Sequence, residues 1–295
     1  MNYYYENNKL ISFNKEVVEE KPFKNVEEPF CLDEEGQKLF SALNQKFKIV
    51  EGILIVGKSK IKLLNEKPPR FDLEEQKTKT KINLTALKNA SRFTSKQNTR
   101  PALLGVMFAE NGTIVATDSY QVFSYTPSTL STNNYIILGP DLVKELIKYD
   151  GVCDIEYTYR YARVYINDIV ITGRLLTGEY PNVLPLLAKE SEELKFNKDQ
   201  LEETLKIGAL LSAKTKVVIL QKNQVTIKGL GEDTNEITQD VELELGYEKK
   251  VIAYDNFKLA IDVVDNYSIQ LGEENKPIIV LNANTKCLLL PMRAY

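Results

Sequence analysis

The sequence repeats one pattern of elements three times, and this repetition constrains the fold more than any other feature. The three segments begin at Phe30, Ile136 and Val251, about 105–115 residues apart. Each predicts a short strand, a helix of about ten residues and then strands with alternating apolar positions. A second pattern of strand, helix, strand and strand begins at Lys81 and again at Lys195. Such duplication indicates an array of like units that pack side by side.

The repeats divide the chain into three expected domains. Residues 78–190 and residues 191–295 each hold both patterns. Residues 1–77 hold the segment from Phe30 and too little chain before it for the other pattern. Within residues 3–28, the stretches KLISF and EVVEEKPF are expected strands, and the polar run Asp72–Thr80 is the expected linker. The fold class is therefore α+β, built from duplicated strand-helix-strand-strand half-units.

One stretch matches a nucleotide-binding motif without its required context. GILIVGKS, from Gly52 to Ser59, fits the phosphate-loop pattern G-x-x-x-x-G-K-[ST]. In that motif the x positions form a loop and a helix begins at the lysine. Here the x positions are apolar residues that favour a strand, and the following residues alternate lysine with apolar side chains. We therefore expect a β-hairpin with a turn near Gly57, and no nucleotide hydrolase.

Composition excludes several classes of enzyme. The chain of 295 residues contains no histidine, which rules out Ser-His and Cys-His nucleophiles. The three cysteines lie far apart in the sequence, so neither a zinc site nor a disulfide framework is expected. No metal or cofactor is implied. The N-terminus lacks a signal-peptide pattern and no apolar run reaches ~18 residues, so we expect a cytoplasmic protein with no membrane partner.

Lysines and arginines recur on expected helices although the net charge is −3, so any contact with DNA must come from local clusters. A helix within Leu84–Lys96 would place its basic residues in one stripe, opposite its apolar face. A helix over Asp141–Tyr149 would do the same. A solvated face is the ordinary explanation of one stripe, whereas two on equivalent helices favour contact with phosphates. The helices near Asp199 and Asn256 mix lysine with carboxylates and would attract DNA less. The candidate DNA-binding residues are Lys88, Arg92, Lys96, Arg100, Lys144, Lys148, Lys206 and Lys258.

Four short stretches of these repeats resemble the bacterial β sliding clamp, the processivity subunit of DNA polymerase III. They are RPALLGVMF (Arg100–Phe108), VATDSYQV (Val115–Val122), GRLLTGEYPN (Gly173–Asn182) and LLLPMR (Leu288–Arg293). Their order and spacing within matching repeats make the resemblance specific. It covers residues 78–295 well and about 30–75 loosely. The family implies a head-to-tail ring with sheets outside and helices lining a channel around duplex DNA, without catalysis.

The resemblance also implies a pocket between the second and third domains, where a DNA polymerase and a clamp loader dock short linear peptides. An apolar cleft with a few polar groups suits the aromatic and aliphatic anchors of such peptides. Taken without the resemblance, TDSYQV and LPMR would be an ordinary strand end and a core strand. The pocket residues carried over are Leu103, Thr117, Ser119, Tyr120, Gln121, Val122, Pro181, Leu186, Leu288, Leu289, Leu290, Pro291, Met292 and Arg293.

The chain departs from the family pattern in three places. After TD the family usually has Gly, His or Tyr, Arg and Leu, whereas this chain has SYQV, so Gln121 replaces a guanidinium. The family usually ends in Arg-Leu, whereas this chain ends in Arg293-Ala294-Tyr295. We expect both changes to alter peptide preference. The shortened first domain is the third departure, and it favours an origin in a phage or mobile element.

The family's ring contact uses the second half-unit of the first domain, which this chain retains. The basic GILIVGKS hairpin would then face the acidic segment GEDTNEITQD of the third domain in a homodimer. The expected function is a DNA sliding clamp that tethers a replicative polymerase. The alternative is a clamp-derived protein that binds replication partners without closing a ring on DNA. The candidate interface residues are Lys58, Lys60, Lys62, Leu210, Leu211, Glu232, Asp233 and Glu236.

Overall fold

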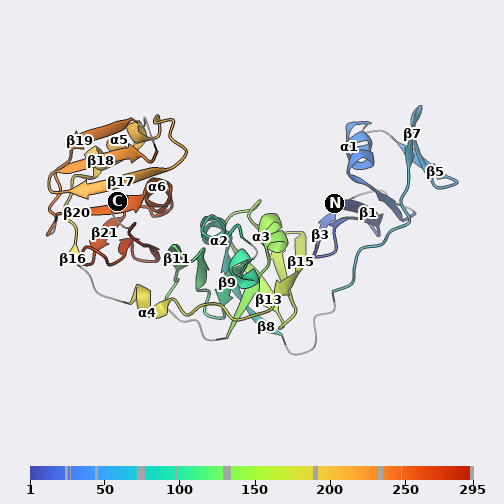
Figure 1. The fold of residues 1–295 in the computed structure, drawn as a ribbon. Coiled ribbons are helices and arrows are strands. Elements are labelled where there is room, and N and C mark those ends of the chain that lie inside the picture. Colours follow the sequence, from blue (N-terminus) through green and yellow to red (C-terminus); the bar gives the residue numbers. More distant parts are fainter. Residues whose placement is uncertain are drawn as a thin grey trace. The chain divides into compact units, whose positions relative to one another are not determined.

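The computed structural model describes residues 1–23, 26, 28–43, 46–71, 77–97, 99–128, 134–188, 192–231, 235–246 and 248–292. The chain divides into two compact units. Unit 1 contains Met1–Lys88, Gly105–Gly112 and Asn134–Glu179, and unit 2 contains Asn89–Leu104, Thr113–Asn133 and Tyr180–Tyr295. Figure 1 shows the fold as a ribbon, with many of the helices and strands labelled.

Unit 1 begins with an antiparallel meander. Its strands are β1 (Asn2–Glu6), β2 (Lys9–Phe13) and β3 (Val17–Pro22), with β4 (Phe30–Leu32) on the other side of β1. The expected strands KLISF and EVVEEKPF are confirmed as β2 and β3. Helix α1 (Glu34–Leu43) follows Asp33, whose Oδ1 accepts the N–H of Gly36 at 2.7 Å and so caps the helix. The core between α1 and these strands is aromatic: Tyr5 stacks on Phe30 with ring centres 4.4 Å apart.

The GILIVGKS stretch is a hairpin, as expected. β5 (Phe47–Val50), β6 (Ile53–Val56) and β7 (Ser59–Lys62) form a separate antiparallel sheet. Val56 lies opposite Ser59, so Gly57 and Lys58 make a two-residue turn. Gly57 has a φ of 60°, the left-handed conformation that such turns require. Because the residues that would cradle phosphates are paired in β6, this stretch cannot act as a phosphate loop.

The rest of unit 1 is an antiparallel sheet with α3 (Pro140–Leu146) beside its long strand, β15 (Ile169–Leu176). Along one edge of β15 the order continues through β14 (Tyr161–Ile166) and β13 (Val152–Tyr157) to β8 (Thr78–Asn83). The other edge pairs with β3 and with β12 (Tyr135–Leu138), which continues to β9 (Val106–Ala109). Leu142, Val143 and Leu146 of α3 are buried, as expected of its inward face.

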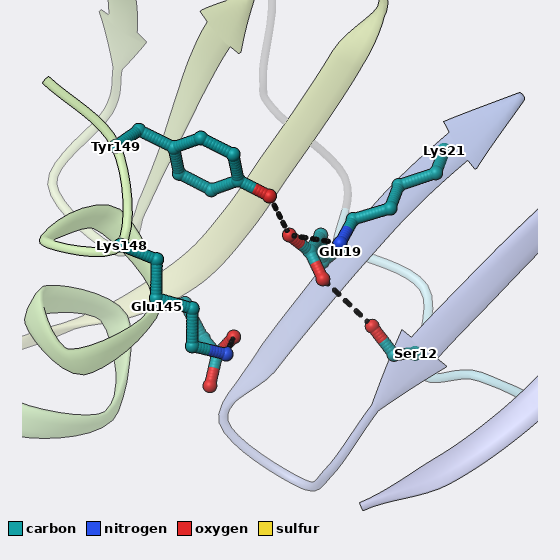
Figure 2. Close-up of polar contacts among 6 residues, drawn as sticks. All are labelled: Ser12, Glu19, Lys21, Glu145, Lys148 and Tyr149. Carbon is teal, nitrogen blue, oxygen red and sulfur yellow. Dashed lines mark hydrogen bonds and ion pairs between the residues drawn. The ribbon is translucent and has the colours of Figure 1, made fainter. Parts of the chain in front are cut away.

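A buried carboxylate lies where β3 joins this sheet. Glu19 of β3 is only 3% exposed. Figure 2 shows its three partners: Tyr149 and Ser12 donate their hydroxyls to it, and the Lys21 ammonium lies 3.2 Å away. Burial raises the pKa of Glu19, but these hydrogen bonds and the Lys21 charge outweigh it and hold the pKa below its usual value. The charge is therefore compensated, and the meander is joined to the region after α3.

Unit 2 contains two antiparallel sheets. One has the order β16 (Glu192–Glu193), β21 (Ser268–Leu271), β22 (Ile278–Leu281), β23 (Thr285–Leu289), β11 (Gln121–Tyr125) and β10 (Ile114–Thr117). The other has the order β19 (Glu236–Asp240), β18 (Gln224–Gly229), β17 (Lys216–Gln221) and β20 (Lys249–Ala253). Helices α5 (Lys198–Gly208) and α6 (Tyr254–Val263) lie against this second sheet, drawn in orange in Figure 1.

Close packing fixes α5 and α6 in place. Asn197 caps α5, because its side chain accepts the N–H of Gln200 at 3.2 Å. The Tyr254 hydroxyl of α6 donates to the carbonyl of Leu205 at 2.6 Å. A methyl group at Gly208 would lie 2.3 Å from the Cδ1 atom of Ile227, so a larger residue here would force that side chain to move.

The expected repeats are confirmed in chain order. A strand, a helix and three strands occur as β4-α1-β5-β6-β7, β12-α3-β13-β14-β15 and β20-α6-β21-β22-β23. The other pattern occurs as β8-α2-β9-β10-β11, with α2 at Leu84–Ser91 and the short turn η1 at Pro101–Leu104, and as β16-α5-β17-β18-β19 after the short helix α4 (Leu184–Leu187). None of the helices described is long and apolar enough to cross a membrane. No group of His, Cys, Asp or Glu side chains in the described ranges could hold a metal ion.

Candidate partner-binding cleft and basic surface

The turn between β10 and β11 is held by its own side chains. The Asp118 carboxylate accepts the backbone N–H groups of Tyr120 (2.9 Å) and Gln121 (3.0 Å) and the side-chain amide of Gln121 (3.1 Å). The Thr117 hydroxyl donates to the carbonyl of Gln121 at 2.6 Å. Ser119 has a φ of 81°, in the left-handed region that favours glycine. This geometry presents Tyr120, whose residue surface is 69% exposed.

The segment after Glu179 is fastened to the same turn. The phenol oxygen of Tyr180 accepts the backbone N–H of Thr117 at 3.1 Å. Burial raises the pKa of Tyr180, so this phenol stays neutral. Farther along, Lys286 of β23 donates to the carbonyl of Leu187 at 3.3 Å. Pro181 and Leu186 are thereby held in the part of unit 2 that contains β10 and β23, with Leu186 40% exposed.

The C-terminal stretch LLLPM lies beside the β10–β11 turn. β11 pairs with β23, with Gln121 opposite Leu289 and Val122 opposite Leu288. The backbone N–H of Leu290 then donates to the carbonyl of Tyr120 at 3.0 Å, and that of Met292 donates to the carbonyl of Val251 at 2.8 Å. The structure thus brings together residues 117–122 and 288–292, as expected. Arg293, Ala294 and Tyr295 lie outside the described residues.

Burial divides the expected pocket residues into two groups. Leu290 is 41% exposed and joins Tyr120 and Leu186 as an apolar side chain that a partner can reach. Pro181 is exposed, and Pro291 and Met292 are half-buried. The remaining apolar members are buried and support these from beneath: Leu103, Val122, Leu288 and Leu289. Sequence reasoning missed Tyr180, because nothing local marks a tyrosine for a contact with a strand 63 residues away.

The first basic stripe is not helical over its whole length. α2 ends at Ser91, so Lys88 is on the helix, whereas Arg92, Lys96 and Arg100 follow it. The Lys88 ammonium lies 3.9 Å from the Asp150 carboxylate, with which it forms an ion pair. The helix ends early because Phe93 turns inward: its N–H donates to the carbonyl of Ala90 and its ring packs 5.4 Å from that of Phe123.

The other basic residues differ in how far they are neutralised. Lys144 is exposed on α3, whereas Lys148 forms an ion pair with Glu145. Lys206 is exposed on α5, and Lys258 of α6 pairs with Asp262 at 2.9 Å. The expectation that the helices of residues 191–295 attract DNA less than α3 stays a prediction, because α3 and α5 each carry one such exposed lysine, Lys144 and Lys206.

The candidate interface residues lie at strand edges and on exposed ends. In unit 1, Lys58 occupies the hairpin turn and Lys60 and Lys62 are exposed on β7. In unit 2, Leu210 is 80% exposed just beyond α5, and Leu211 is half-buried. The Glu236 carboxylate of β19 forms an ion pair with the Lys228 ammonium, 3.5 Å away. Glu232 and Asp233 lie outside the described residues.

Comparison with known proteins gives one consistent result. No protein-family model matches the chain. A curated β sliding clamp of Halalkalibacterium halodurans is 30% identical over 190 residues, which cover 58% of this chain and 48% of that protein. The match thus spans about half the length of this relative.

Solved structures match over nearly the whole chain. A Helicobacter pylori β clamp bound to a DNA ligase peptide has a TM-score of 0.80 at 16% identity, and the match covers 99% of this chain and 91% of that one. A Bacillus subtilis DNA polymerase sliding clamp has a TM-score of 0.78 at 16% identity, with 100% and 91% covered. A Pseudomonas aeruginosa sliding clamp has a TM-score of 0.79 at 17% identity, with 99% and 91% covered. The expected resemblance and fold class are confirmed: this chain has the α+β fold of the bacterial DNA polymerase III β sliding clamp and is similar in sequence to a member of that family.

Proposed function

We propose that the chain is a DNA sliding clamp, a ring-shaped homodimer that encircles duplex DNA and tethers a replicative DNA polymerase in the cytoplasm. The observation that carries this proposal is the clamp fold, which matches 99% or more of the chain. The repeats support three clamp domains, at residues 1–77, 78–190 and 191–295. The mechanism is topological: weak contacts with phosphates permit sliding, and ring closure prevents escape. It involves no catalysis and no cofactor.

Two strand edges of opposite charge support a head-to-tail dimer. β7 pairs only with β6 among the described strands, and its exposed face carries Lys60 and Lys62. β19 likewise pairs only with β18 and carries Glu236 and Asp240. Unpaired edges of this kind are templates for another chain, and the charges select which edge joins which. Because each subunit has one edge of each sign, two subunits can close a ring through two identical contacts.

Light scattering tests the dimer. The chain mass is 33.6 kDa, and we expect about twice that mass in solution. Exposed Leu210 would add apolar burial to the charge pairs, which are individually weak. A monomer at tens of micromolar would contradict the closed ring.

The cleft around Tyr120 and Leu290 is proposed to bind linear peptides of the polymerase and the clamp loader. The Helicobacter pylori clamp binds a DNA ligase peptide. In this chain the exposed apolar residues Tyr120, Leu186 and Leu290 offer a surface for such anchors. Fluorescence anisotropy with a labelled peptide that contains Gln and a Leu-Phe pair tests this. Saturable binding is expected, and no binding would contradict it.

A clamp-derived interaction protein is the second candidate. It would keep the cleft but bind replication partners without a closed ring on DNA. The ion pairs Lys258–Asp262 and Lys148–Glu145 favour it, because they remove positive charge from helices that would face DNA. A monomer that still binds the peptide would support this candidate over the clamp.

A further inference from the structure

A lysine is buried in unit 2 and binds the backbone of a neighbouring loop. Lys250 of β20 is only 1% exposed. Its ammonium donates to three backbone carbonyls of the loop between β21 and β22: Gly272 (3.2 Å), Glu273 (2.8 Å) and Lys276 (2.9 Å). An ammonium has three donors, so this loop provides one acceptor for each. Burial lowers the pKa of Lys250 to about 8, and the charge of Glu274 opposes this shift.

The loop that Lys250 holds leads into the strand next to residues 290–292, which we call the wall of the proposed cleft. In the β22–β23 pair, Ile278 lies opposite Leu289 and Ile279 opposite Leu288. β22 begins at Ile278 and β23 ends at Leu289, so Pro277 of the loop and Leu290 of the wall both adjoin this paired strand end. The wall therefore begins at the strand end from which the loop held by Lys250 also leaves.

The same wall is attached to the strand that carries Lys250. The backbone N–H of Met292 donates to the carbonyl of Val251, the next residue of β20. Leu290 thus adjoins the strand end from which the loop leaves, and Met292 is bound to β20 by a hydrogen bond. Lys250 is the side chain that joins these two supports.

We propose that Lys250 is a positioning residue for the peptide cleft: by binding residues 272–276 to β20, it sets the place of Leu290, Pro291 and Met292. The inference rests on the proposed function, since it assumes that this cleft binds peptides. Lys250 would not touch the peptide, because its side chain is enclosed. The peptide would instead meet a wall whose position depends on a cation behind it.

The first test compares Lys250→Met with Lys249→Met, which removes the same charge from the neighbouring, partly exposed residue of β20. Lys250→Met leaves three carbonyls without their donors, so we expect the labelled peptide to bind about tenfold more weakly. Lys249→Met should bind like the parent. Lys250→Gln, which retains two N–H donors, should fall between the parent and Lys250→Met. Equal affinity of all three variants and the parent would overturn the inference.

A double variant separates positioning from general destabilisation. If Lys250 acts through Met292, adding Lys250→Met to Met292→Ala should weaken the peptide little beyond Met292→Ala alone. If the two losses multiply instead, Lys250 acts elsewhere and the proposal is wrong. Failure of the parent to bind peptide would reject the proposed function itself, which distinguishes it from failure of this inference.

Hydrogen exchange of the unaltered protein decides the case if the variants do not fold. The amide of Lys276 donates to Glu273 within the loop, and the amide of Met292 donates to Val251. If Lys250 supports both hydrogen bonds, the amides of Lys276 and Met292 should become exchangeable together, with the same opening equilibrium. Independent opening of Met292 would contradict the proposal.

Discussion

The backbone N–H of Leu290 donates to the carbonyl of Tyr120 at 3.0 Å. The bond joins two stretches that are 170 residues apart in the chain, and both side chains remain exposed beside it. Tyr120 is exposed on the β10–β11 turn, which the hydrogen bonds to the Asp118 carboxylate hold closed. The exposed surface of the proposed cleft is therefore formed by a turn and a C-terminal stretch that are each fixed by hydrogen bonds to the backbone.

Adjacent leucines should separate stability from binding. Leu289 is buried and Leu290 is 41% exposed. Leu289→Ala should lower the free energy of unfolding by about 2–5 kcal/mol, because it opens a cavity in the core. Leu290→Ala should leave unfolding nearly unchanged and weaken the labelled peptide. Urea unfolding and anisotropy measure the two effects, and a peptide affinity unaffected by Leu290→Ala would show that the partner binds elsewhere.

Met292→Ala tests whether Met292 is a central anchor of the proposed cleft. Removing a central anchor contact costs about 2 kcal/mol or more, which corresponds to a roughly thirtyfold loss of peptide affinity. Tyr159→Ala provides the control, because Tyr159 is an exposed aromatic residue of unit 1. We expect that control to bind peptide normally. If Met292→Ala also binds normally, the cleft has been assigned to the wrong residues.

Charge reversal on the β7 edge should weaken the dimer. Lys60→Glu with Lys62→Glu places two negative charges opposite Glu236 and Asp240 in each proposed contact. Sedimentation should show a larger dissociation constant that rises less steeply with salt. Mixing this variant with the double variant Glu236→Lys and Asp240→Lys should restore both contacts, because one contact then pairs the two reversed edges and the other pairs the two native edges. An unchanged dimer in the first variant would exclude this edge from the interface.

Acid should remove one ion-pair contribution in unit 1. Hydrogen bonds from Lys77 and Lys79 lower the pKa of Glu156 to about 2, against 4.5 for an ordinary glutamate. A lowered folded-state pKa stabilises the fold above pH 4.5, and the contribution is lost as the pH falls towards 2. Glu156→Gln should therefore show a shallower loss of unfolding free energy across this range. Asp154→Asn, at the exposed pair with Lys81, should behave like the parent.

The repeats predicted the order of elements because strand and helix periodicities are local signals. KLISF and the GILIVGKS hairpin were recognised for the same reason. The end of α2 was not predictable, because helical spacing continues to Lys96 while the packing of Phe93 on Phe123 ends the helix at Ser91. In the cleft, the stretches TDSYQV and LLLPM were found through the family resemblance. Tyr180 and Lys250 were missed, because their roles depend on distant backbone groups.

Retention on DNA with closed ends tests the central claim most directly. A linear duplex with biotin at both ends is incubated with the protein so that rings can thread over the free ends, and streptavidin then blocks them. For direct binding to phosphates, the logarithm of the affinity falls with the logarithm of the salt concentration, with a slope of about 0.9 for each phosphate contacted. Retention of an encircling ring does not depend on these contacts. The account predicts that protein stays on the blocked duplex at high salt and leaves once the duplex is cut between the blocks. Loss at high salt while both ends are blocked, or retention after cutting, would contradict a sliding clamp.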